Sequence, residues 1–203
     1  MFGNILITGA TGSFGKAFLN YLIKIKYKKK IIIFSRDELK QYHLKKRYPH
    51  NKNLRFFLGD IRDLPRLNYA FSDVDTVVHA AALKQVDTAE YNSFEYIKTN
   101  ILGSENVISA SLNNKVKKVV ALSTDKASSP VNLYGATKLC SDKLFSAANL
   151  HKGKKNIKFM VVRYGNVFGS RGSIISKLLE EKKNKKFNLT NPEMTRFNIS
   201  LQE

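Results

Sequence analysis

The chain has 203 residues, of which 43% are hydrophobic, so it can bury one domain-sized core and is not a disordered tail. Its formal net charge of +19 raises the question of a nucleic-acid partner. Most of the excess is lysine, however, no nucleic-acid-binding motif accompanies it, and aromatic side chains do not alternate with the lysines of the basic runs as stacking platforms would. We therefore expect no nucleic-acid partner and interpret the lysines as a solvated surface that attracts anionic ligands.

Cysteine usage and hydropathy exclude several other classes. The single cysteine, Cys140, rules out an internal disulfide, and no cysteine or histidine cluster has metal-ligand spacing. The first residues lack the basic and apolar regions of a secretory signal, and no apolar run approaches the ~20 residues of a membrane helix. We expect a cytoplasmic protein that holds no metal and does not bind a membrane.

Short apolar runs at 5–8, 31–34, 55–58, 76–79, 118–123 and 159–164 predict strands. Their β-branched residues without polar alternation are typical of parallel strands that are covered on both faces. Segments with helical spacing separate the runs; Leu19, Leu22 and Ile23 make one such stripe. This alternation predicts an α/β fold, a doubly wound parallel sheet of the Rossmann type with helices on both faces.

The first predicted strand leads into the glycine-rich stretch TGATGSFG and then into a helix expected to begin near Lys16. Glycines here permit a tight turn, close approach of the backbone to a pyrophosphate, and packing of helix against strand. The helix N-terminus offers free N–H groups to the anion. A turn without ligand is the alternative, but the strand before and the helix after favour a dinucleotide site. Its expected residues are Gly9, Thr11, Gly12, Ser13, Phe14 and Gly15.

The end of the second strand indicates which dinucleotide is bound. An acidic residue there would bind the ribose of NAD, whereas arginine accommodates the 2′-phosphate of NADP. Ser35 and Arg36 follow the strand, so we predict NADP. Asp37 and Glu38 are expected to cap the next helix rather than touch the ribose. Asp60 and Ile61 follow the third strand and are expected at the adenine, with a plain turn as the alternative.

The stretch STDKASSPVNLYGATK, residues 123–138, combines a carboxylate, two amines and a phenol. Tyr134 and Lys138 are spaced i, i+4, so they share a helix face. An ammonium and a nicotinamide cation nearby would favour the phenolate, and Tyr134 could then accept a hydroxyl proton as hydride leaves the same carbon. Asp125 and Lys126 follow the fifth strand, where ligands of such sheets bind, which favours a catalytic role over a surface ion pair.

Seven motifs follow one another between residues 8 and 197: TGATGSFG, SRDELKQ, GDIRD, HAAALKQVDTAEYN, STDKASSPVNLYGATK, YGNVFGSRGS and PEMTRF. Together they resemble the extended short-chain dehydrogenase/reductase superfamily, and more narrowly the configuration-inverting UDP-N-acetylglucosamine 4,6-dehydratases, also called the CapD-like polysaccharide-biosynthesis family. The resemblance therefore covers essentially the whole chain. The motifs are more specific together than any one of them is alone.

The resemblance implies a reaction for the segment Thr124-Asp125-Lys126. Retaining relatives carry Thr-Asp-Glu there, and 4-epimerases lack the acid and base pair. Once C4 of the sugar is oxidised, Lys126 would remove the C5 proton and must be neutral, which nearby positive charge and desolvation promote. Asp125 would protonate the departing C6 hydroxyl and needs a raised pKa. Hydride returns to C6, C5 is inverted, and Ser123 and Thr124 polarise the C4 oxygen.

Further contacts also come from the resemblance. Ala80, Ala81, Lys84, Thr99 and Val167 are implied at the cofactor together with Tyr134 and Lys138, whereas Thr99 and Asn100 could instead hold a loop. Lys84, Asn166, Arg171, Gly172, Ser173 and Arg196 are implied at the substrate. A solvated turn is nearly as good an interpretation of 170–173. His79 is expected to complete the fourth strand, and Cys140 to be packing on the catalytic helix.

We expect residues 1–165 to form the NADP-binding domain with the catalytic segment, and 166–203 to begin an incomplete substrate-binding region. Members of the resembled family are longer, and Ser200 with Glu203 has the form of a capping box, which announces a helix. We therefore interpret the chain as truncated, with poor turnover of its substrate UDP-N-acetylglucosamine and a homo-oligomer at full length. A 4-epimerase or reductase of the same fold, and a non-catalytic NADP-binding fragment, are the alternatives.

Overall fold

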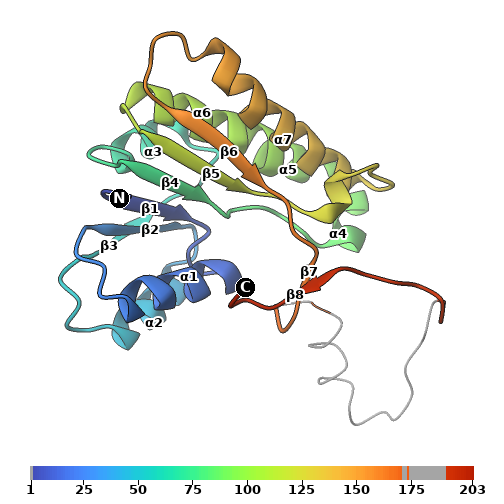
Figure 1. Ribbon diagram of the computed structural model, residues 1–203, viewed down its shortest axis with the longest axis horizontal. Helices are drawn as coiled ribbons and strands as arrows, with labels where there is room; N and C mark the ends of the chain where they lie inside the picture. The colour runs from blue at the N-terminus through green and yellow to red at the C-terminus, as the bar shows by residue number, and fades with distance from the viewer. Residues whose placement is uncertain (1, 171–172, 174–190) are drawn as a thin grey trace.

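The computed structural model describes residues 2–170, 173 and 191–203, and Figure 1 shows their arrangement. The elements follow in the order β1 (Ile5–Thr8), α1 (Ser13–Lys24), β2 (Ile31–Ser35), α2 (Glu38–Arg47), β3 (Leu54–Leu58), α3 (Leu64–Ala70), β4 (Thr76–His79), α4 (Val86–Tyr91), α5 (Ser93–Tyr96), the π-helical η1 (Ile97–Leu102), α6 (Gly103–Asn113), β5 (Lys118–Leu122), the 3₁₀-helical η2 (Asp125–Ala127), α7 (Leu133–His151), β6 (Lys158–Val162), β7 (Asn166–Val167) and β8 (Asn198–Ile199). All six strands expected from the sequence are present, with ends that differ by at most two residues.

Six strands form one parallel sheet in the order β3-β2-β1-β4-β5-β6. Chain order runs outward from β1 in one direction and from β4 in the other, so the topological switch point lies between these two strands. Ligands of doubly wound sheets bind at the carboxyl ends of the strands at that point. The predicted fold class is confirmed, and it fixes where a site belongs.

Helices cover both faces of the sheet. In Figure 1, α1 and α2 lie on one side, below the strands, and α3, α6 and α7 on the other. The side chains of β1 alternate as a strand requires: Ile5 and Ile7 join the core beneath α1, whereas Leu6 joins the core that contains Phe145 of α7. Within the described residues, no helix combines the length and apolarity needed to cross a membrane.

Helix α1 begins at Ser13, three residues before the predicted start. Gly12 is its N-cap, and the Lys16 N–H already donates to the Gly12 carbonyl at 3.0 Å. The chain thus becomes helical as soon as the glycine turn ends, and Ser13, Phe14 and Gly15 form the first helical turn. The expected cap of α2 is confirmed, since the Asp37 carboxylate accepts from the Lys40 N–H at 2.8 Å.

The capping box expected at 200–203 is also formed. The Ser200 N–H donates to Glu203 Oε2 at 2.9 Å, and the Glu203 N–H donates to Ser200 Oγ at 3.2 Å. These reciprocal bonds are the ones that such a sequence makes at the start of a helix.

Two glycines set the spacing around the turn after β1. Gly9 has φ of 65°, and a Cβ on it would lie 2.8 Å from backbone atoms of Ala80 and Ala81, which follow β4. A Cβ on Gly15 would lie 2.4 Å from the Cα of Ala10. Any larger residue would therefore push the turn away from β4 or helix α1 away from the turn.

Gly9→Ala tests this close approach, and Gly153→Ala is its matched control, because Gly153 also has positive φ (62°) but nothing within 4 Å of its Cβ position. The control is expected to lose about 1 kcal/mol of unfolding free energy from backbone strain alone. Gly9→Ala should lose a further ~1–3 kcal/mol from overpacking. Urea unfolding measures both, and equal losses would contradict the close approach.

Candidate active site

A cleft of ≈ 520 Å³ opens beyond the carboxyl ends of β1 to β4, at the switch point of the sheet. Ten of the residues expected at a cofactor line it: Gly9, Thr11, Gly12, Ser35, Arg36, Asp60, Ile61, Ala80, Ala81 and Thr99. They come from five separate segments of the chain. The topology brings them together because parallel strands end at the same edge.

The other cofactor candidates lie outside the lining of this cleft. The Phe14 ring packs with the core beneath α1 and stacks on Phe18 at a centroid distance of 5.8 Å, since α1 begins early and turns this side chain inward. Ser13 opens the helix, and Gly15 packs on Ala10. Lys84 is exposed on the loop after β4.

Charged side chains form a chain of ion pairs at one end of the cleft. Arg36 and Arg62 both contact Asp60 Oδ2, at 3.4 and 2.8 Å, and Arg62 continues to Glu95 at 2.7 Å. Burial raises the pKa of Asp60, but hydrogen bonds from Arg62 and the charge of Arg36 outweigh it and leave the pKa lowered. Asp60 thus stays ionised and holds the Arg36 guanidinium at the edge of the cleft.

Sequence reasoning missed Lys40 and Gln41 in this region. Lys40 lines the cleft and pairs with Asp37. The Gln41 amide donates to Ser35 Oγ at 3.0 Å and to the Phe57 carbonyl at 2.9 Å, which ties β2 to β3. The signal available was Lys40 itself, a cation in the first turn of the helix that follows Arg36.

Beneath the cleft, a buried polar chain crosses the sheet. Thr8 Oγ1 accepts from the Ala80 and Ala81 N–H groups at 3.2 Å and lies 2.8 Å from His79 Nδ1. Because its acceptor sites are taken, the hydroxyl donates to Nδ1, and the ring proton belongs on Nε2, which faces Ser104 Oγ at 3.5 Å. Burial and the charge of Lys138 lower the pKa of His79 to about 3, so the ring is neutral.

The polar chain ends on α7, the helix that carries Tyr134 and Lys138. Ser104 Oγ lies 2.8 Å from Ser141 Oγ of α7. One turn earlier, in the π-helical segment, the Asn100 side chain exchanges two hydrogen bonds of 2.9 Å with the backbone of Leu83 and donates to Thr137 Oγ1 at 3.1 Å. Asn100 was expected either to reach the cofactor or to hold a loop. Its hydrogen bonds to Leu83 give it the second role, because they hold the loop after β4.

The segment Thr124-Asp125-Lys126 forms a hydrogen-bonded turn directly after β5. Asp125 Oδ1 accepts from Thr124 Oγ1 at 2.9 Å and from Lys126 Nζ at 3.1 Å, and Nζ also donates to Asn166 Oδ1 at 2.9 Å. Burial raises the Asp125 pKa, but the bonds from Thr124 and Lys126 prevail and lower it. The expected raised pKa of Asp125 is therefore wrong here, because the Lys126 ammonium and the Thr124 hydroxyl stabilise the carboxylate.

Tyr134 and Lys138 are both buried on α7, with 9% and 5% of their surfaces exposed. Burial raises the pKa of Tyr134 to about 12, although a hydrogen bond with Thr124 opposes the rise. Burial lowers the pKa of Lys138 to about 8, and its Nζ donates to the Leu122 carbonyl at 2.7 Å. Lys138 is thus held against the end of β5, and it does not lower the phenol's pKa as expected.

Gly135 lets α7 approach this turn. A Cβ on Gly135 would lie 2.3 Å from the Lys126 carbonyl oxygen. The helix begins two residues earlier, capped by Asn132, whose Oδ1 accepts from the Gly135 N–H at 2.8 Å. Contact between helix and turn is what brings the Tyr134 hydroxyl to Thr124.

Two buried hydroxyls in the site have no hydrogen-bond partner among the described residues: Thr99 Oγ1, in the cleft, and Ser123 Oγ, at the end of β5. An unpaired buried hydroxyl is costly, so each marks a place where a ligand's polar group is favoured. Together with the glycine turn and the cationic end of the cleft, they fit an extended anionic ligand with polar groups along its length.

The substrate candidates after β6 lie in and around the small β7–β8 sheet. Asn166 contacts Lys126 as described, Val167 pairs with Ile199, and Ser173 donates its N–H to the Ser170 carbonyl at 2.9 Å. Arg196 is exposed and donates to the Thr195 carbonyl. Arg171 and Gly172 lie outside the described residues.

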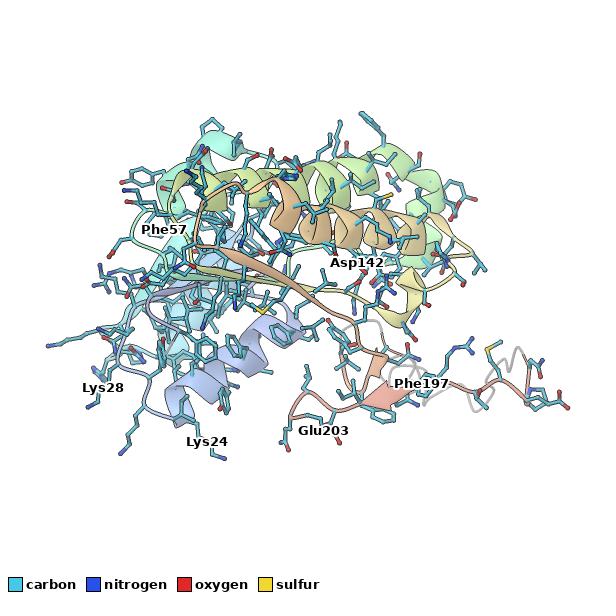
Figure 2. All side chains as sticks on the ribbon, turned by 45° about the horizontal axis from the view of Figure 1, so that its top comes forward. Lys24, Lys28, Phe57, Asp142, Phe197 and Glu203 are labelled. Carbon is cyan, nitrogen blue, oxygen red and sulfur yellow. The ribbon has the colours of Figure 1, made fainter. Side chains whose placement is uncertain are left out.

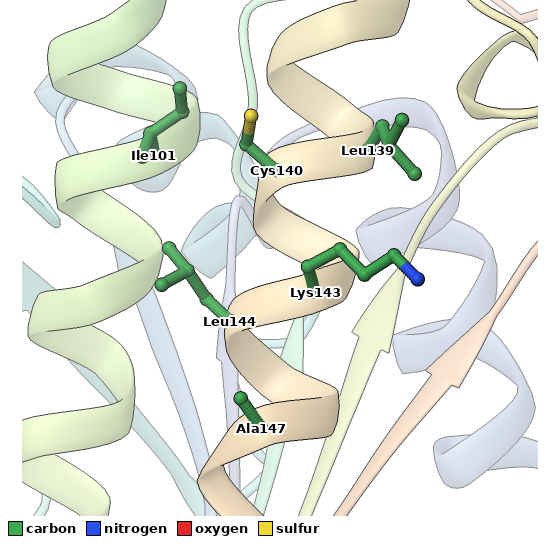
Figure 3. A pocket seen from close by; sticks show the side chains of 6 residues that line it. All are labelled: Ile101, Leu139, Cys140, Lys143, Leu144 and Ala147. Carbon is green, nitrogen blue, oxygen red and sulfur yellow. The ribbon is translucent and has the colours of Figure 1, made fainter.

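Cys140 is exposed, so the expectation that it packs in the interior is wrong. It lines a shallow apolar groove on the outer face of α7, with Ile101, Leu139, Lys143, Leu144 and Ala147 (Figure 3). The helix directs Tyr134, Lys138 and Ser141 inward. Cys140 lies on the opposite side of the helix.

The sequence profile of a family described as "Polysaccharide biosynthesis protein" matches residues 5–203. The chain belongs to this family. It is 56% identical over 202 residues to a UDP-N-acetylglucosamine 4,6-dehydratase (inverting) of Campylobacter jejuni, covering 98% of this chain and 60% of that protein. A UDP-glucose 4-epimerase of Rickettsia bellii is 48% identical, with 97% and 59% covered. The chain thus spans about 60% of the length of these curated relatives.

Solved structures agree on the fold. The structure of Pen from Bacillus thuringiensis superposes with a TM-score of 0.94 at 42% identity, covering 99% of this chain and 62% of that one. DesIV from Streptomyces venezuelae, a dTDP-glucose 4,6-dehydratase solved with NAD, gives a TM-score of 0.85 at 22% identity, with 98% and 68% covered. At that identity, the likeness to DesIV concerns the fold alone.

The buried Lys138 predicts a pH dependence of stability. Its folded pKa of about 8 lies below the ordinary value of 10.5. Between these values the unfolded chain binds more protons, so the unfolding free energy should rise from pH 8 to pH 10, by at most about 3 kcal/mol from this residue. Lys138→Met should lack this rise in urea unfolding. Lys143→Met, on the exposed side of α7, is the control; equal slopes in both variants would contradict the assignment.

Proposed function

We propose that this chain carries the cofactor-binding and catalytic core of a UDP-N-acetylglucosamine 4,6-dehydratase. The product would be a 4-keto-6-deoxy UDP-sugar inverted at C5, for surface polysaccharide or glycoprotein sugars. One observation carries the proposal: a hydrogen-bonded Asp125–Lys126 pair lies at the end of β5, together with the buried Tyr134 and Lys138 of α7. Asp125 also accepts a hydrogen bond from Thr124. Similarity to the Campylobacter dehydratase supports it.

The cofactor we propose is NADP, which would accept hydride from the sugar and return it within one catalytic cycle. Gly9, Gly12 and the N-terminus of α1 would hold its pyrophosphate. Arg36 and Lys40 are two cations at the cleft suited to a 2′-phosphate, and Ser35, the last residue of β2, lines the cleft beside them. The related structures of MoeE5 and DesIV were solved with NAD, so the choice of NADP rests on these residues of the chain.

Oxidation at C4 requires a base for the hydroxyl proton, and we assign it to Tyr134. With a pKa of about 12, the phenol is a weak base by itself, so the step needs positive charge nearby. Lys138 lies one turn further along α7, and its Nζ is held by the Leu122 carbonyl. Ser123, with its unpaired hydroxyl, and Thr124 would donate to the C4 oxygen.

Elimination of water requires a neutral amine and a neutral carboxylic acid, whereas Asp125 and Lys126 form an ion pair. One proton passed from Lys126 Nζ to Asp125 Oδ1, across 3.1 Å, converts the pair into the required acid and base without changing its net charge. A bound sugar excludes solvent from the two side chains, and this loss of solvation favours the neutral forms over the ion pair. Lys126 then takes the C5 proton, and Asp125 gives its proton to the C6 hydroxyl, which leaves as water.

Sugar-nucleotide 4-epimerisation is the second candidate, because relatives named UDP-glucose 4-epimerase are 46–48% identical. Epimerisation needs hydride exchange at C4 but no acid and base for C5 and C6. The bonded Asp125–Lys126 pair, held further by Asn166, is therefore the feature that favours dehydration. A non-catalytic dinucleotide-binding role would need neither this pair nor the buried Tyr134.

The division at residues 165 and 166 remains a proposal. We assign the six-stranded sheet to the cofactor, and we assign the β7–β8 region to the start of the part that holds the uridine diphosphate. A cytoplasmic location and a homo-oligomer also remain predictions.

Lys126→Ala tests the reaction. Mass spectrometry of UDP-N-acetylglucosamine incubated with the chain and NADP should detect a product that has lost one water. The variant should lose at least ~10³-fold in rate and keep NADP affinity within about twofold, since Lys126 lies outside the cleft lining. Lys143→Ala is the matched control. A product of unchanged mass would favour epimerisation, and loss of NADP affinity would give Lys126 another role.

Arg36→Ala tests the cofactor choice. Loss of a charge-assisted contact to a 2′-phosphate should weaken NADP binding by about 10- to 100-fold and leave NAD binding almost unchanged. Isothermal titration calorimetry measures both affinities, with Arg47→Ala, at the far end of α2, as the control. Equal affinity of the unmodified chain for NAD and NADP would contradict the assignment.

A further inference from the structure

The edge of the sheet opposite the cleft gathers the lysine-rich segments of the chain. Because all six strands are parallel, every return from a helix to the next strand lies at the edge where the strands begin. We call this the amino edge and define it by residues 24–30, 45–55, 72–76, 114–118 and 151–158. Each segment holds the end of a helix, the loop after it, the first residues of a strand, or a combination of these.

Nearly all of the excess positive charge of the described chain lies at the amino edge. Seventeen Lys and Arg residues stand there against two acidic ones, Asp73 and Asp75, whereas the other described residues hold twelve of each sign. The seventeen are Lys24, Lys26, Lys28, Lys29, Lys30, Lys45, Lys46, Arg47, Lys52, Arg55, Lys115, Lys117, Lys118, Lys152, Lys154, Lys155 and Lys158. These lysines are scattered along the sequence, but the topology of the sheet places them at one edge of the molecule.

These cations face solvent. Fifteen of the seventeen are exposed, and Lys118 and Lys152 are partly so. The two acidic residues pair locally, Asp73 with Lys30 at 2.9 Å and Asp75 with Lys117 at 2.6 Å. Figure 2 shows Lys24 and Lys28 extending away from the body of the molecule. The edge therefore presents a broad positive surface rather than a set of ion pairs.

Helix dipoles explain only part of this arrangement. Cations in the last turn of a helix are stabilised by its negative end, which accounts for Lys24 of α1 and for Lys45 to Arg47 of α2. The effect fades within a turn, so it does not explain Lys28, Lys52 or Lys154, which lie in loops. Most of the positive surface lies beyond the reach of any helix terminus.

Apolar side chains project among the cations. Phe2 is 52% exposed, Ile25 between Lys24 and Lys26 is 50% exposed, and Leu150 near the end of α7 is 88% exposed. The Lys118 ammonium lies 5.8 Å from the Phe2 ring. Exposed Phe, Leu and Ile side chains surrounded by lysines are typical of surfaces that bind the interface of a bilayer.

We propose that the amino edge docks on an anionic lipid bilayer, which replaces the expectation from the sequence that the protein does not bind a membrane. Six strands span about 24 Å, so the surface is broad, as a bilayer requires. Nearly all its cations are lysines, which act as point charges and lack the bidentate geometry by which arginine recognises nucleic-acid phosphates and bases. A protein docked in this way keeps the cleft, at the opposite edge, open to solution. The inference does not depend on which reaction the site performs.

Vesicle flotation tests the docking. The chain should float with phosphatidylcholine vesicles that contain about one third phosphatidylglycerol and remain behind with pure phosphatidylcholine. Binding should fall at least tenfold as salt rises from about 0.05 to 0.5 M, because exposed charges are screened. Failure to float with the anionic vesicles at low salt would overturn the proposal.

Two charge-reversal variants separate position from net charge. Lys28→Glu with Lys154→Glu should weaken vesicle binding at least tenfold, whereas Lys16→Glu with Lys143→Glu, away from the amino edge, changes net charge equally and should weaken it less than about threefold. Circular dichroism confirms that both variants fold. Equal losses of vesicle binding in the two variants would show an effect of net charge alone and would overturn the proposal. Displacement of the protein from the anionic vesicles by duplex DNA, at an equal concentration of phosphate, would show a nucleic-acid surface and would also overturn it.

Discussion

The contact between Gly135 and the Lys126 carbonyl is the constraint on which the site depends. It allows the N-terminus of α7 to lie directly against the turn after β5, where a single Cβ would lie 2.3 Å from that oxygen. With the contact made, the Tyr134 hydroxyl reaches Thr124, and Lys138 reaches the Leu122 carbonyl. The phenol, both amines and the carboxylate are then gathered by one helix and one strand end.

The buried polar chain extends this rigidity to the cofactor cleft. Thr8 holds the loop after β4, His79 connects Thr8 to Ser104, and Ser104 meets Ser141 of the same helix that carries Tyr134. The His79 ring is neutral over the physiological pH range, so the hydrogen bonds of this polar chain do not change with pH. The cleft and α7 are thus held in register by buried side chains that do not line the cleft, and we regard these as positioning residues.

Sequence patterns predicted the strands and their class, because fully buried parallel strands leave continuous apolar runs such as ILIT and IIIF. They also predicted the strand-end location of Asp125 and the shared face of Tyr134 and Lys138, since both follow from local spacing. The contacts that charged side chains make with residues far away in the sequence could not be predicted. Asn166 meets Lys126 across forty residues, and Asp60 meets Arg36 across twenty-four. Such pairings follow from topology. The Asp125 pKa, in contrast, is lowered by the chain neighbours Thr124 and Lys126, and it was predicted in the wrong direction because the sequence does not show that their side chains bind this carboxylate.

The two edges of the sheet carry different kinds of residues. Glycine backbone, ion pairs and buried titratable groups lie where the strands end, and an excess of exposed lysines lies where they begin. The central claim concerns the first edge, and deuterium at C4 of UDP-N-acetylglucosamine tests it most directly. With the chain and NADP, the label should appear at C6 of a product that has lost water. A label that stays at C4 of a product of unchanged mass would contradict the account.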